Sequence, residues 1–426
     1  MTAPPRTNSP LGGLRNARLP RWLLPSDWPT DHGAPALAHL RFNERGQLQF
    51  VLPQAHDSTA ASPGDEWDLG GALVLPGLVD AHTHLDKTFT LSRMGTVRPG
   101  LLGAIEAMMA DRKQWTPDDI RARASRALEM AWAAGVVHLR THCDWWEPQT
   151  TPLAWPVLRE LAAEWAGRIR LERASLVPLH LYADRDTAMS IAATVRASGE
   201  GALLGGFVHT SNWNATALRH LFDAAQAHGL NVDLHVDEEL DPRAQGLSTI
   251  AAIVKDIAFD GHVVCGHVCA LSAQDESLAL RTLDAVAASP QITLASLPIT
   301  NLLLQDAQVD RTPRLRGITL LKEARARGIP LVIASDNVED PFCPVGSFDP
   351  LEAFGVGVSV GQLPQAFDRW SASVCRSDWL SRNSGVATSV LQAGRAANFV
   401  VFEAANAWSF PSRTQPRSVI RNGSVT

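Results

Sequence analysis

GALVLPGLVDAHTH, residues 71–84, is an apolar run typical of a buried strand, and it ends in two histidines. Segments with helical periodicity separate it from seven further runs, at residues 135–144, 169–178, 202–210, 230–238, 262–269, 292–298 and 330–337. Eight strand–helix alternations predict an α/β fold, a closed parallel (β/α)8 TIM barrel, with an open doubly wound sheet as the second choice. No G-x-G-x-x-G motif follows any run, which disfavours dinucleotide binding.

The two ends of the chain follow a different pattern. Short apolar runs broken by turn residues, typical of antiparallel strands, occupy residues 35–75 and return at 391–426. We therefore expect residues 21–75 and 391–426 to form one small β domain beside a barrel of residues 76–390. Residues 1–20 are rich in Pro, Gly, Ser and Arg, and we expect a flexible N-terminal arm.

Composition excludes several classes of partner. The chain has 426 residues, 45% of them hydrophobic, and a formal charge of −6, so it lacks the basic field that binds nucleic acid or anionic lipid. The sequence contains no run of about 20 apolar residues, so we predict no membrane span. The N-terminus lacks the apolar core of a signal peptide. Five scattered cysteines favour a reducing compartment, so we predict a cytoplasmic protein.

Polar residues suited to catalysis fall at the carboxyl ends of four predicted strands. These are His82 and His84 on the first, His235 and Glu238 on the fifth, His267 on the sixth and Asp336 on the eighth. In a barrel those ends meet at one mouth. The sequence therefore predicts an active site there.

The histidines and Asp336 predict a metal site. His82 and His84 are two residues apart on a strand, so both side chains point the same way. His235 would add a third nitrogen and Asp336 a carboxylate, which leaves a coordination position for a water molecule whose pKa the ion would lower. We also predict that Asp336 is the catalytic base that accepts the proton of this water. The alternatives are a histidine pair in a polar loop and a helix-capping role for Asp336.

Glu238 and His267 are the remaining catalytic candidates. We predict that Glu238 is the general acid and proton shuttle, although spacing alone does not decide whether it, Asp237 or Glu239 points inward. His267 would hydrogen-bond the developing oxyanion or the attacking water. The nearby Cys265 and Cys269 are interpreted as buried packing residues rather than thiolate ligands.

Other polar and aromatic residues near the strand ends have two interpretations each. His142 and His209 could line the pocket or lie in the core, and Lys87 could contact substrate or lie on the surface. Three tryptophans could form an aromatic wall for a flat substrate or pack in loops: Trp145, Trp146 and Trp213.

Four motifs together carry a family resemblance: PGLVDAHTHLDKTFT (76–90), LHVDEELDP (234–242), CGHVCALS (265–272) and ASDNVEDPFCPVG (334–346). The chain resembles the amidohydrolase superfamily and, within it, the cytosine deaminase-like family. The resemblance implies a distorted barrel with a composite β-sandwich from both termini, one Zn2+ or Fe2+ ion, and a homo-oligomer. It places the metal ligands on His82, His84, His235 and Asp336, the proton shuttle on Glu238 and the catalytic histidine on His267.

Departures from the cytosine deaminase pattern concern the substrate. Leu179 replaces a glutamine that grips the pyrimidine, Asn337 replaces an aspartate, and Phe342 replaces a tryptophan. Lys87 replaces a small hydroxyl residue and is similar to relatives that remove alkylamines or ammonia from triazine-like rings. With His209, these four residues are the predicted substrate contacts.

The predicted reaction is deamination of a small cytosine-like or aminotriazine-like heterocycle. The first alternative is hydrolysis of a cyclic amide or a ring N-alkylamine at the same mononuclear site, and the second is a catalytically silent metal-binding relative. Two metals are disfavoured because the VHT segment around His209 offers no lysine that could become a bridging ligand.

Overall fold

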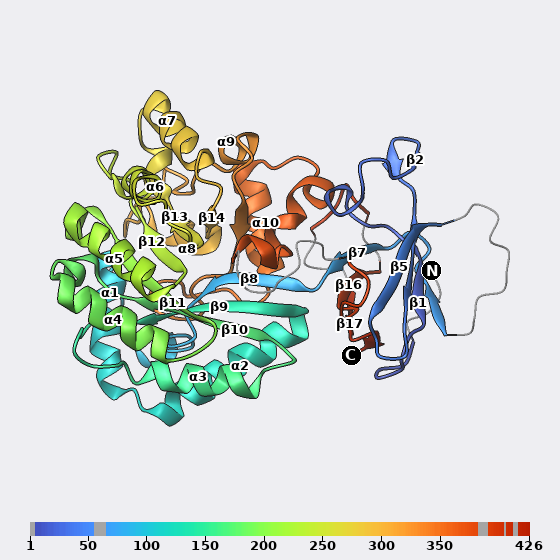
Figure 1. The fold of residues 1–426 in the computed structure, drawn as a ribbon, viewed down its shortest axis with the longest axis horizontal. Coiled ribbons are helices and arrows are strands. Elements are labelled where there is room, and N and C mark those ends of the chain that lie inside the picture. Colours follow the sequence, from blue (N-terminus) through green and yellow to red (C-terminus); the bar gives the residue numbers. More distant parts are fainter. Residues whose placement is uncertain (1–4, 55–64, 382–390, 404–405, 412–415) are drawn as a thin grey trace.

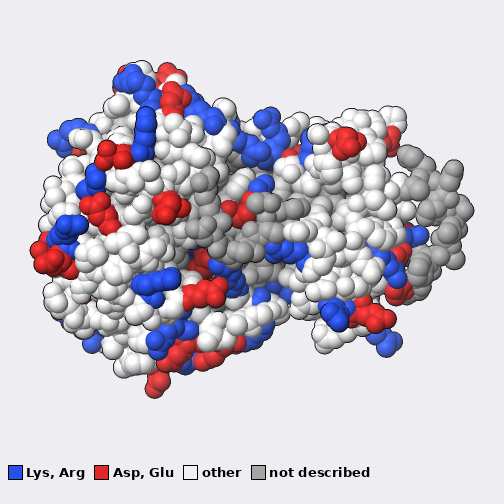
Figure 2. Space-filling model, viewed as in Figure 1, with Lys and Arg blue, Asp and Glu red and all other residues white. Residues whose placement is uncertain are grey.

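A computed structural model describes residues 5–54, 65–381, 391–403, 406–411 and 416–426. The chain forms a large α/β barrel with a small all-β unit beside it, and both termini lie in the small unit (Figure 1). Within these ranges, no helix is long and apolar enough to cross a membrane. On the face shown in Figure 2, acidic and basic side chains are interspersed.

The barrel is a sheet of eight parallel strands in sequential order. They are β8 (Leu78–Thr83), β9 (Val136–Asp144), β10 (Arg170–Leu176), β11 (Ala202–Val208), β12 (Val232–Val236), β13 (Val263–His267), β14 (Ile292–Ser296) and β15 (Leu331–Ile333). A parallel bridge between Thr83 and Asp336 brings the first and last strands together, and the Asp336 amide donates to the His82 carbonyl at 2.8 Å. The predicted barrel is therefore confirmed, and each of its strands falls within a predicted run.

The first predicted run serves both parts of the molecule. It divides at Gly77 into β7 (Leu73–Pro76), which pairs with the C-terminal β16, and the barrel strand β8. A side chain at Gly77 would collide with Val137, since a Cβ there would lie 2.5 Å from a methyl group. Glycine thus permits the close approach of β8 to the start of β9.

Helices surround the barrel strands in Figure 1. They are α1 (Leu101–Asp111), α2 (Pro117–Ala134), α3 (Ala154–Glu164), α4 (Arg185–Ala197), α5 (Ala215–His228), α6 (Gly246–Asp256), α7 (Glu276–Ala287), α8 (Pro298–Leu304), α9 (Leu321–Ala326) and α10 (Pro350–Gly361). Helix α2 shows how the sequence sets their ends: the Thr116 hydroxyl accepts from the Asp119 amide, Pro117 occupies the first turn, and Gly135 ends the helix in a left-handed conformation.

Two four-stranded sheets build the small unit. One contains β1 (Gly13–Ala17), β4 (Ala38–Phe42), β5 (Leu48–Pro53) and β6 (Glu66–Asp68), and the other contains β7, β16 (Phe399–Phe402), β17 (Arg417–Arg421) and β18 (Ser424–Val425). A short hairpin, β2 (Thr30–Asp31) and β3 (Ala34–Pro35), lies beside them. Leu14, Phe42, Val74 and Phe399 contribute to one shared core, so side chains from both sheets pack together.

The expectation of a flexible arm over residues 1–20 is wrong for β1. That strand lies between β4 and β6 in its sheet, and Leu14 and Ala17 are buried in the core of the small unit. The Pro- and Gly-rich composition concealed a short strand whose few apolar side chains all face inward. Residues 1–4 lie outside the described residues.

Candidate metal centre and active-site cavity

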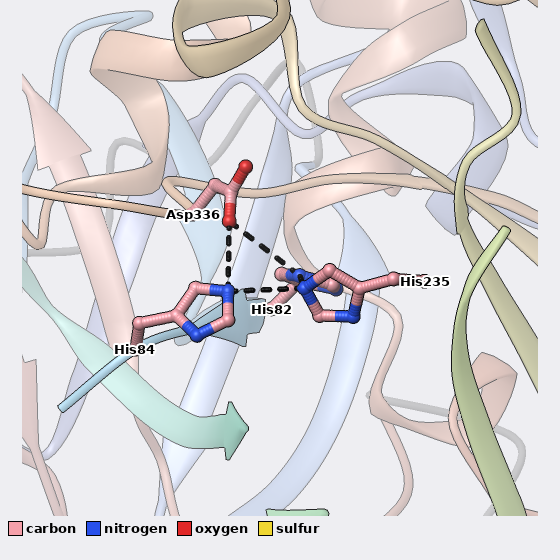
Figure 3. Close-up of side chains that lie close together, drawn as sticks. All are labelled: His82, His84, His235 and Asp336. Carbon is pink, nitrogen blue, oxygen red and sulfur yellow. Dashed lines mark hydrogen bonds and ion pairs between the residues drawn. The ribbon is translucent and has the colours of Figure 1, made fainter. Parts of the chain in front are cut away.

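The predicted metal ligands converge at the carboxyl ends of the barrel strands. His82 lies on β8, His84 follows it, His235 lies on β12 and Asp336 follows β15, and all four are buried. Figure 3 shows the three imidazoles and the carboxylate turned toward one point. Their ligand atoms all lie within 4.8 Å of one another.

The separations within this cluster suit a single bound cation. The His235 Nε2 atom lies 3.2 Å from that of His82 and 3.1 Å from that of His84. The Asp336 Oδ1 atom lies 3.5 Å from the His82 Nε2 and 3.2 Å from the His84 Nε2. Ligands held tetrahedrally at about 2.0 to 2.1 Å from zinc are about 3.3 to 3.4 Å apart. The cluster thus has the spacing of a metal site.

Charge and hydrogen bonding also fit a metal. Burial lowers the pKa of His82, His84 and His235 well below the usual range, and neighbouring histidines add to the effect. The histidines are therefore neutral and can donate lone pairs. Neither carboxylate oxygen of Asp336 has a hydrogen-bond partner within the described part of the chain. A cation bound between these side chains would compensate the buried charge of the Asp336 carboxylate and accept the lone pairs of the three histidines.

Three residues where strands β13 and β15 end have a strained backbone conformation. Asp336, His267 and Val268 have φ values of 63°, 67° and 44°, in the left-handed region that non-glycine residues seldom adopt. Val268 is β-branched, for which this conformation is particularly costly. The chain thus turns sharply where β13 and β15 end, and these turns direct His267 and Asp336 into the mouth.

Glu238 is the carboxylate of its segment that faces the site. Its Oε1 atom lies 3.2 Å from the His267 Nδ1, and its side chain lines the cavity described below. Asp237 instead accepts hydrogen bonds from the first amides of α6, and Glu239 accepts from the Thr210 amide. Burial raises the pKa of Glu238 well above the usual range, and the Asp336 carboxyl raises it further. Glu238 is therefore suited to carry a proton at neutral pH.

His267 lies between Glu238 and the metal ligands. Its ring centroid is 4.7 Å from that of His235, and its Nδ1 atom is 3.0 Å from the Asn301 side-chain amide. The Nε2 atom has no hydrogen-bond partner among the residues that the model covers. Burial lowers the pKa of His267 to about 3, so the ring is neutral. Asn301 therefore orients an imidazole with one nitrogen left for a reacting group.

A cavity opens above the metal ligands. His84, His235 and Glu238 contribute to its lining. Its other walls are mostly apolar and aromatic and consist of Leu101, Ile105, Met108, Trp146, Leu176, Pro178, Phe207 and Phe342. Lys87, Asp144 and Asn337 add polar groups. An apolar slot with few polar groups beside a metal centre suits a flat, polar-edged ring.

Lys87 forms a buried ion pair at this cavity. Its Nζ atom lies 2.7 Å from Asp144 Oδ1 and 4.8 Å from the centre of the Phe342 ring. Burial lowers the pKa of Lys87, but Asp144 and Asp86 outweigh that effect and leave it raised. The lysine is therefore a permanent cation, and of its two predicted positions the surface one is wrong.

Asn337 and Phe342, both predicted substrate contacts, line the cavity. The Asn337 side-chain amide donates to Asp340 at 2.6 Å, and the Phe342 backbone amide donates to the same carboxylate at 2.9 Å. Asp340 thus holds both of these cavity-lining residues in place. Its own pKa is raised to about 6 by burial.

Two predicted substrate contacts need correction. Leu179 follows Pro178 into the short helix η4 (Leu179–Tyr182), and its side chain packs in the barrel core, so Pro178 lines the cavity in its place. His209 stacks on Phe207, and its Nδ1 accepts from the Ser211 amide, so it caps the short helix η5 (Thr210–Asn212) rather than lining the cavity. Both residues follow strand ends, but the local turn directs their side chains away from the mouth.

The structure also shows where His142, the two cysteines and the three tryptophans lie. The ring of His142 lies 3.9 Å from that of His82, beneath the metal ligands. Cys265 and Cys269 are buried free thiols, which confirms their interpretation as packing residues. Trp146 lines the cavity, Trp145 packs in the barrel core, and Trp213 packs against that core.

Sequence reasoning missed three polar residues that support the site: Asp144, Asn301 and Asp340. Asp144 ends β9, so the strand-end pattern that identified the histidines could have identified it too. Asn301 lies in α8 and Asp340 in the loop after β15, and no spacing pattern distinguishes either one. Their roles depend on contacts made after the barrel closes.

Comparison with known proteins agrees with this geometry. The model of the amidohydrolase family matches residues 93–426. A pterin deaminase of Rhizobium rhizogenes is 36% identical over 382 residues, which cover 89% of this chain and 86% of that protein. Two solved structures superpose over 97% of this chain. The first is the 5-methylcytosine deaminase from Klebsiella pneumoniae, of whose own chain 96% is covered, with a TM-score of 0.81 and 26% sequence identity. The second is the N-isopropylammelide isopropylaminohydrolase from Burkholderia multivorans, of whose own chain 97% is covered, with a TM-score of 0.74 and 22% sequence identity. The second similarity concerns the fold alone.

Proposed function

The chain belongs to the amidohydrolase family, and from this premise we propose that it deaminates a flat nitrogen heterocycle, with a pterin-type ring as the first candidate. Family membership confirms the resemblance seen in the sequence and identifies a metal-dependent hydrolase of carbon–nitrogen bonds other than peptide bonds. The observation that carries the proposal is the convergence of the metal cluster, Glu238 and His267 on one aromatic-walled cavity.

The proposed cofactor is one divalent ion, Zn2+ or Fe2+, held by His82, His84, His235 and Asp336. Such an ion, when bound, polarises a water molecule so that it is deprotonated near neutral pH. A second buried cluster, formed by His82, His142 and Asp233, does not favour a second ion. The Arg140 guanidinium already lies 2.7 Å from the Asp233 carboxylate, and its positive charge opposes a cation there.

The side chains around the centre can manage the protons of hydrolysis. Asp336 can accept the proton of the attacking water through the oxygen that faces away from the histidines. Glu238, protonated because its pKa is raised, can donate to a ring nitrogen beside the reacting carbon. The neutral His267 can hydrogen-bond the oxygen that is added to that carbon. The proton taken up by Asp336 can then pass to the amino group, the carbon–nitrogen bond breaks and ammonia leaves. The added hydroxyl returns a proton to Glu238 and becomes the ring carbonyl, so one water is consumed for each ammonia released.

The cavity supports a planar substrate. Trp146, Phe207 and Phe342 offer aromatic surfaces to a ring. A pterin carries its amino group on an amidine-type ring carbon, as cytosine and the aminotriazines do, so one mechanism serves all three. Lys87 donates and Asp144 accepts hydrogen bonds, so the pair can bind a ring carbonyl and a ring N–H at the edge away from the metal. The pterin deaminase relative favours the two-ring member of this group.

Ammonia release by metal-loaded protein tests the proposal. The substrate panel consists of pterin, cytosine, isocytosine, creatinine, an aminotriazine and an N-alkylaminotriazine, with Glu238→Gln as the blank and Glu239→Gln as the matched control. We expect ammonia from pterin with wild type and Glu239→Gln, and a rate lower by about 10²-fold or more with Glu238→Gln. Alkylamine release instead of ammonia would favour the ring N-alkylamine alternative. Silence of the wild type with every compound would refute the proposal.

Other predictions from the sequence keep that status. Assembly into a homo-oligomer and a cytoplasmic location rest on the resemblance and on cysteine usage, respectively. Size-exclusion chromatography with light scattering would measure the first. The catalytically silent alternative loses its basis, because the metal cluster, Glu238 and His267 lie together in the geometry that hydrolysis requires.

A further inference from the structure

A second large groove lies at the opposite end of the barrel from the metal centre. It is lined by residues at the starts of β9, β10 and β11, among them Val137, Arg170 and Gly201, and by Asn398 of the small unit. In Figure 1 these strand ends lie on the side of the barrel that faces the small unit. The groove is therefore separate from the catalytic cavity.

The groove is strongly basic. Among the described residues that line it, four are arginines and one is acidic: Arg159, Arg168, Arg170, Arg173 and Glu200. Arg159 has no ion-pair partner in the described ranges, and Arg168 stacks on Trp165 and bonds only to a backbone carbonyl. Arg170 contacts Glu172, but that carboxylate also neutralises the buried Arg140. The groove thus has an excess of positive charge.

Arg173 is the group that most clearly lacks a partner. It is only 2% exposed, its Nε has no hydrogen-bond partner in the part of the chain described, and its Nη2 makes only long bonds of 3.4 and 3.2 Å to the carbonyls of Ser198 and Glu200. Burial lowers its pKa to about 10, and Arg159 adds to the effect. A buried cation normally has a carboxylate or another anion as its partner.

Other buried arginines show how this chain ordinarily compensates such a charge. Arg140 lies 2.6 Å from Glu172 and 2.7 Å from Asp233. Arg421 has no carboxylate, but it lies 3.6 Å above the Trp132 ring and donates to two carbonyls at 3.0 and 2.6 Å. Arg173 has no carboxylate partner among the described residues, and its guanidinium carbon lies 5.7 Å from the centre of the Trp155 ring, a longer and weaker contact than that of Arg421 with Trp132. The partner that it lacks would enter from the groove.

We propose that this groove binds a phosphate-bearing small molecule, whose oxyanion is held by Arg173, Arg159 and the flanking Arg168 and Arg170. Planar guanidinium groups match phosphate oxygens with paired, charge-assisted hydrogen bonds. The groove extends along the starts of three strands, which leaves room beside the phosphate for the organic part of an ester. This ligand is distinct from the heterocycle of the catalytic site.

Isothermal titration calorimetry in phosphate-free buffer tests the site with three probes: inorganic phosphate, pyrophosphate and adenosine monophosphate. We expect pyrophosphate to bind wild type and the Arg159→Gln/Arg168→Gln double variant to bind at least about tenfold more weakly. Both substituted residues are exposed, so folding is preserved. Arg281→Gln, an exposed arginine on α7, is the matched control and should bind like wild type. Tighter binding of adenosine monophosphate than of phosphate would identify an ester as the ligand, and equal binding would identify free phosphate.

Arg173→Met adds a test that does not depend on affinity alone. Without anion, this variant should melt at or above the wild-type temperature, because an unpaired buried charge is removed. With pyrophosphate, the melting temperature of wild type should rise and that of the variant should not. Ammonia release should be unchanged in the Arg159→Gln/Arg168→Gln variant.

Three outcomes would overturn the proposal. One is no binding of any probe to wild type at about 10 mM, far above the Kd of a functional site. Another is an equal loss of binding in the Arg281→Gln control. The third is a change of oligomeric state in the Arg159→Gln/Arg168→Gln variant with pyrophosphate binding unchanged, which would assign the groove to carboxylates of a second copy of the chain.

Discussion

Replacing Lys87 by methionine should destabilise the protein strongly, because it leaves a carboxylate buried without a partner. Lys87 and Asp144 are 3% and 5% exposed and lie 2.7 Å apart. With an effective dielectric constant near 20, charges at that distance attract by about 6 kcal/mol, which offsets the cost of removing them from water. We expect Lys87→Met to lower the free energy of unfolding by about 3–5 kcal/mol.

The double variant Lys87→Met/Asp144→Leu separates the pair from its individual charges. Replacing both partners with apolar groups removes the uncompensated charge, so its stability should return to within about 2 kcal/mol of wild type. Urea unfolding followed by tryptophan fluorescence, with saturating Zn2+, measures both values. Lys255→Met, an exposed lysine on α6, is the matched control and should change stability by less than about 0.5 kcal/mol.

The same variants distinguish a substrate contact from a structural cation. If the Lys87–Asp144 pair binds substrate, the double variant recovers stability but keeps a raised KM. If Lys87 only neutralises Asp144, stability and KM recover together. A loss below about 1 kcal/mol in Lys87→Met would refute the electrostatic reasoning, and so would a double variant less stable than the single one.

Three further predictions concern the acid, the metal and pH. Glu238→Gln should lower kcat by about 10²- to 10⁴-fold in the ammonia assay while metal content, measured by mass spectrometry, stays at the wild-type level; loss of metal would instead make Glu238 a ligand. His84→Ala should bind metal weakly, so added Zn2+ should raise the melting temperature of wild type but not that of the variant. For wild type, Zn2+ at 100 times the Kd adds about 2.7 kcal/mol to the free energy of unfolding. An equal rise in both proteins would exclude His84 from the site. Burial raises the folded-state pKa of Asp340 to about 6, above about 3.9 in the unfolded chain, so the folded state holds the proton more tightly and stability falls as pH rises through this window. Asp340→Asn should remove about 3 kcal/mol of that decline, and parallel urea midpoints for both proteins from pH 4 to 6 would contradict the assignment.

The barrel and the metal ligands could be predicted because both follow from local pattern plus one topological rule. Apolar runs of strand length mark β8 to β15, and parallel strands in a barrel must end at the same mouth. His82, His235 and Asp336 could therefore be grouped although they are far apart in sequence. The pattern failed for β1, where a strand of five residues has too few apolar positions to stand out from turn residues.

The cavity wall and the orientation of individual side chains could not be predicted. His209 and His267 both follow strand ends, yet only His267 faces the metal, because a left-handed turn at the end of β13 directs it there. Lys87 remains a cation in its buried position through Asp144, which comes from a different strand, and through Asp86. Such properties depend on contacts between residues that are far apart in the sequence, and the spacing of residues along one strand does not predict those contacts.

The two ends of the barrel have opposite electrostatic requirements. The carboxyl ends of the strands gather neutral histidines and the Asp336 carboxylate, a set that attracts a cation. The amino ends gather arginines, with Arg173 lacking an anion. Between the two ends, the Arg140 guanidinium is paired with the carboxylates of Glu172 and Asp233. The arginine inside the barrel therefore adds no unpaired positive charge to either end. We therefore expect the two ends to be independent, so that ammonia release and its pH dependence are the same in wild type and in Arg159→Gln/Arg168→Gln.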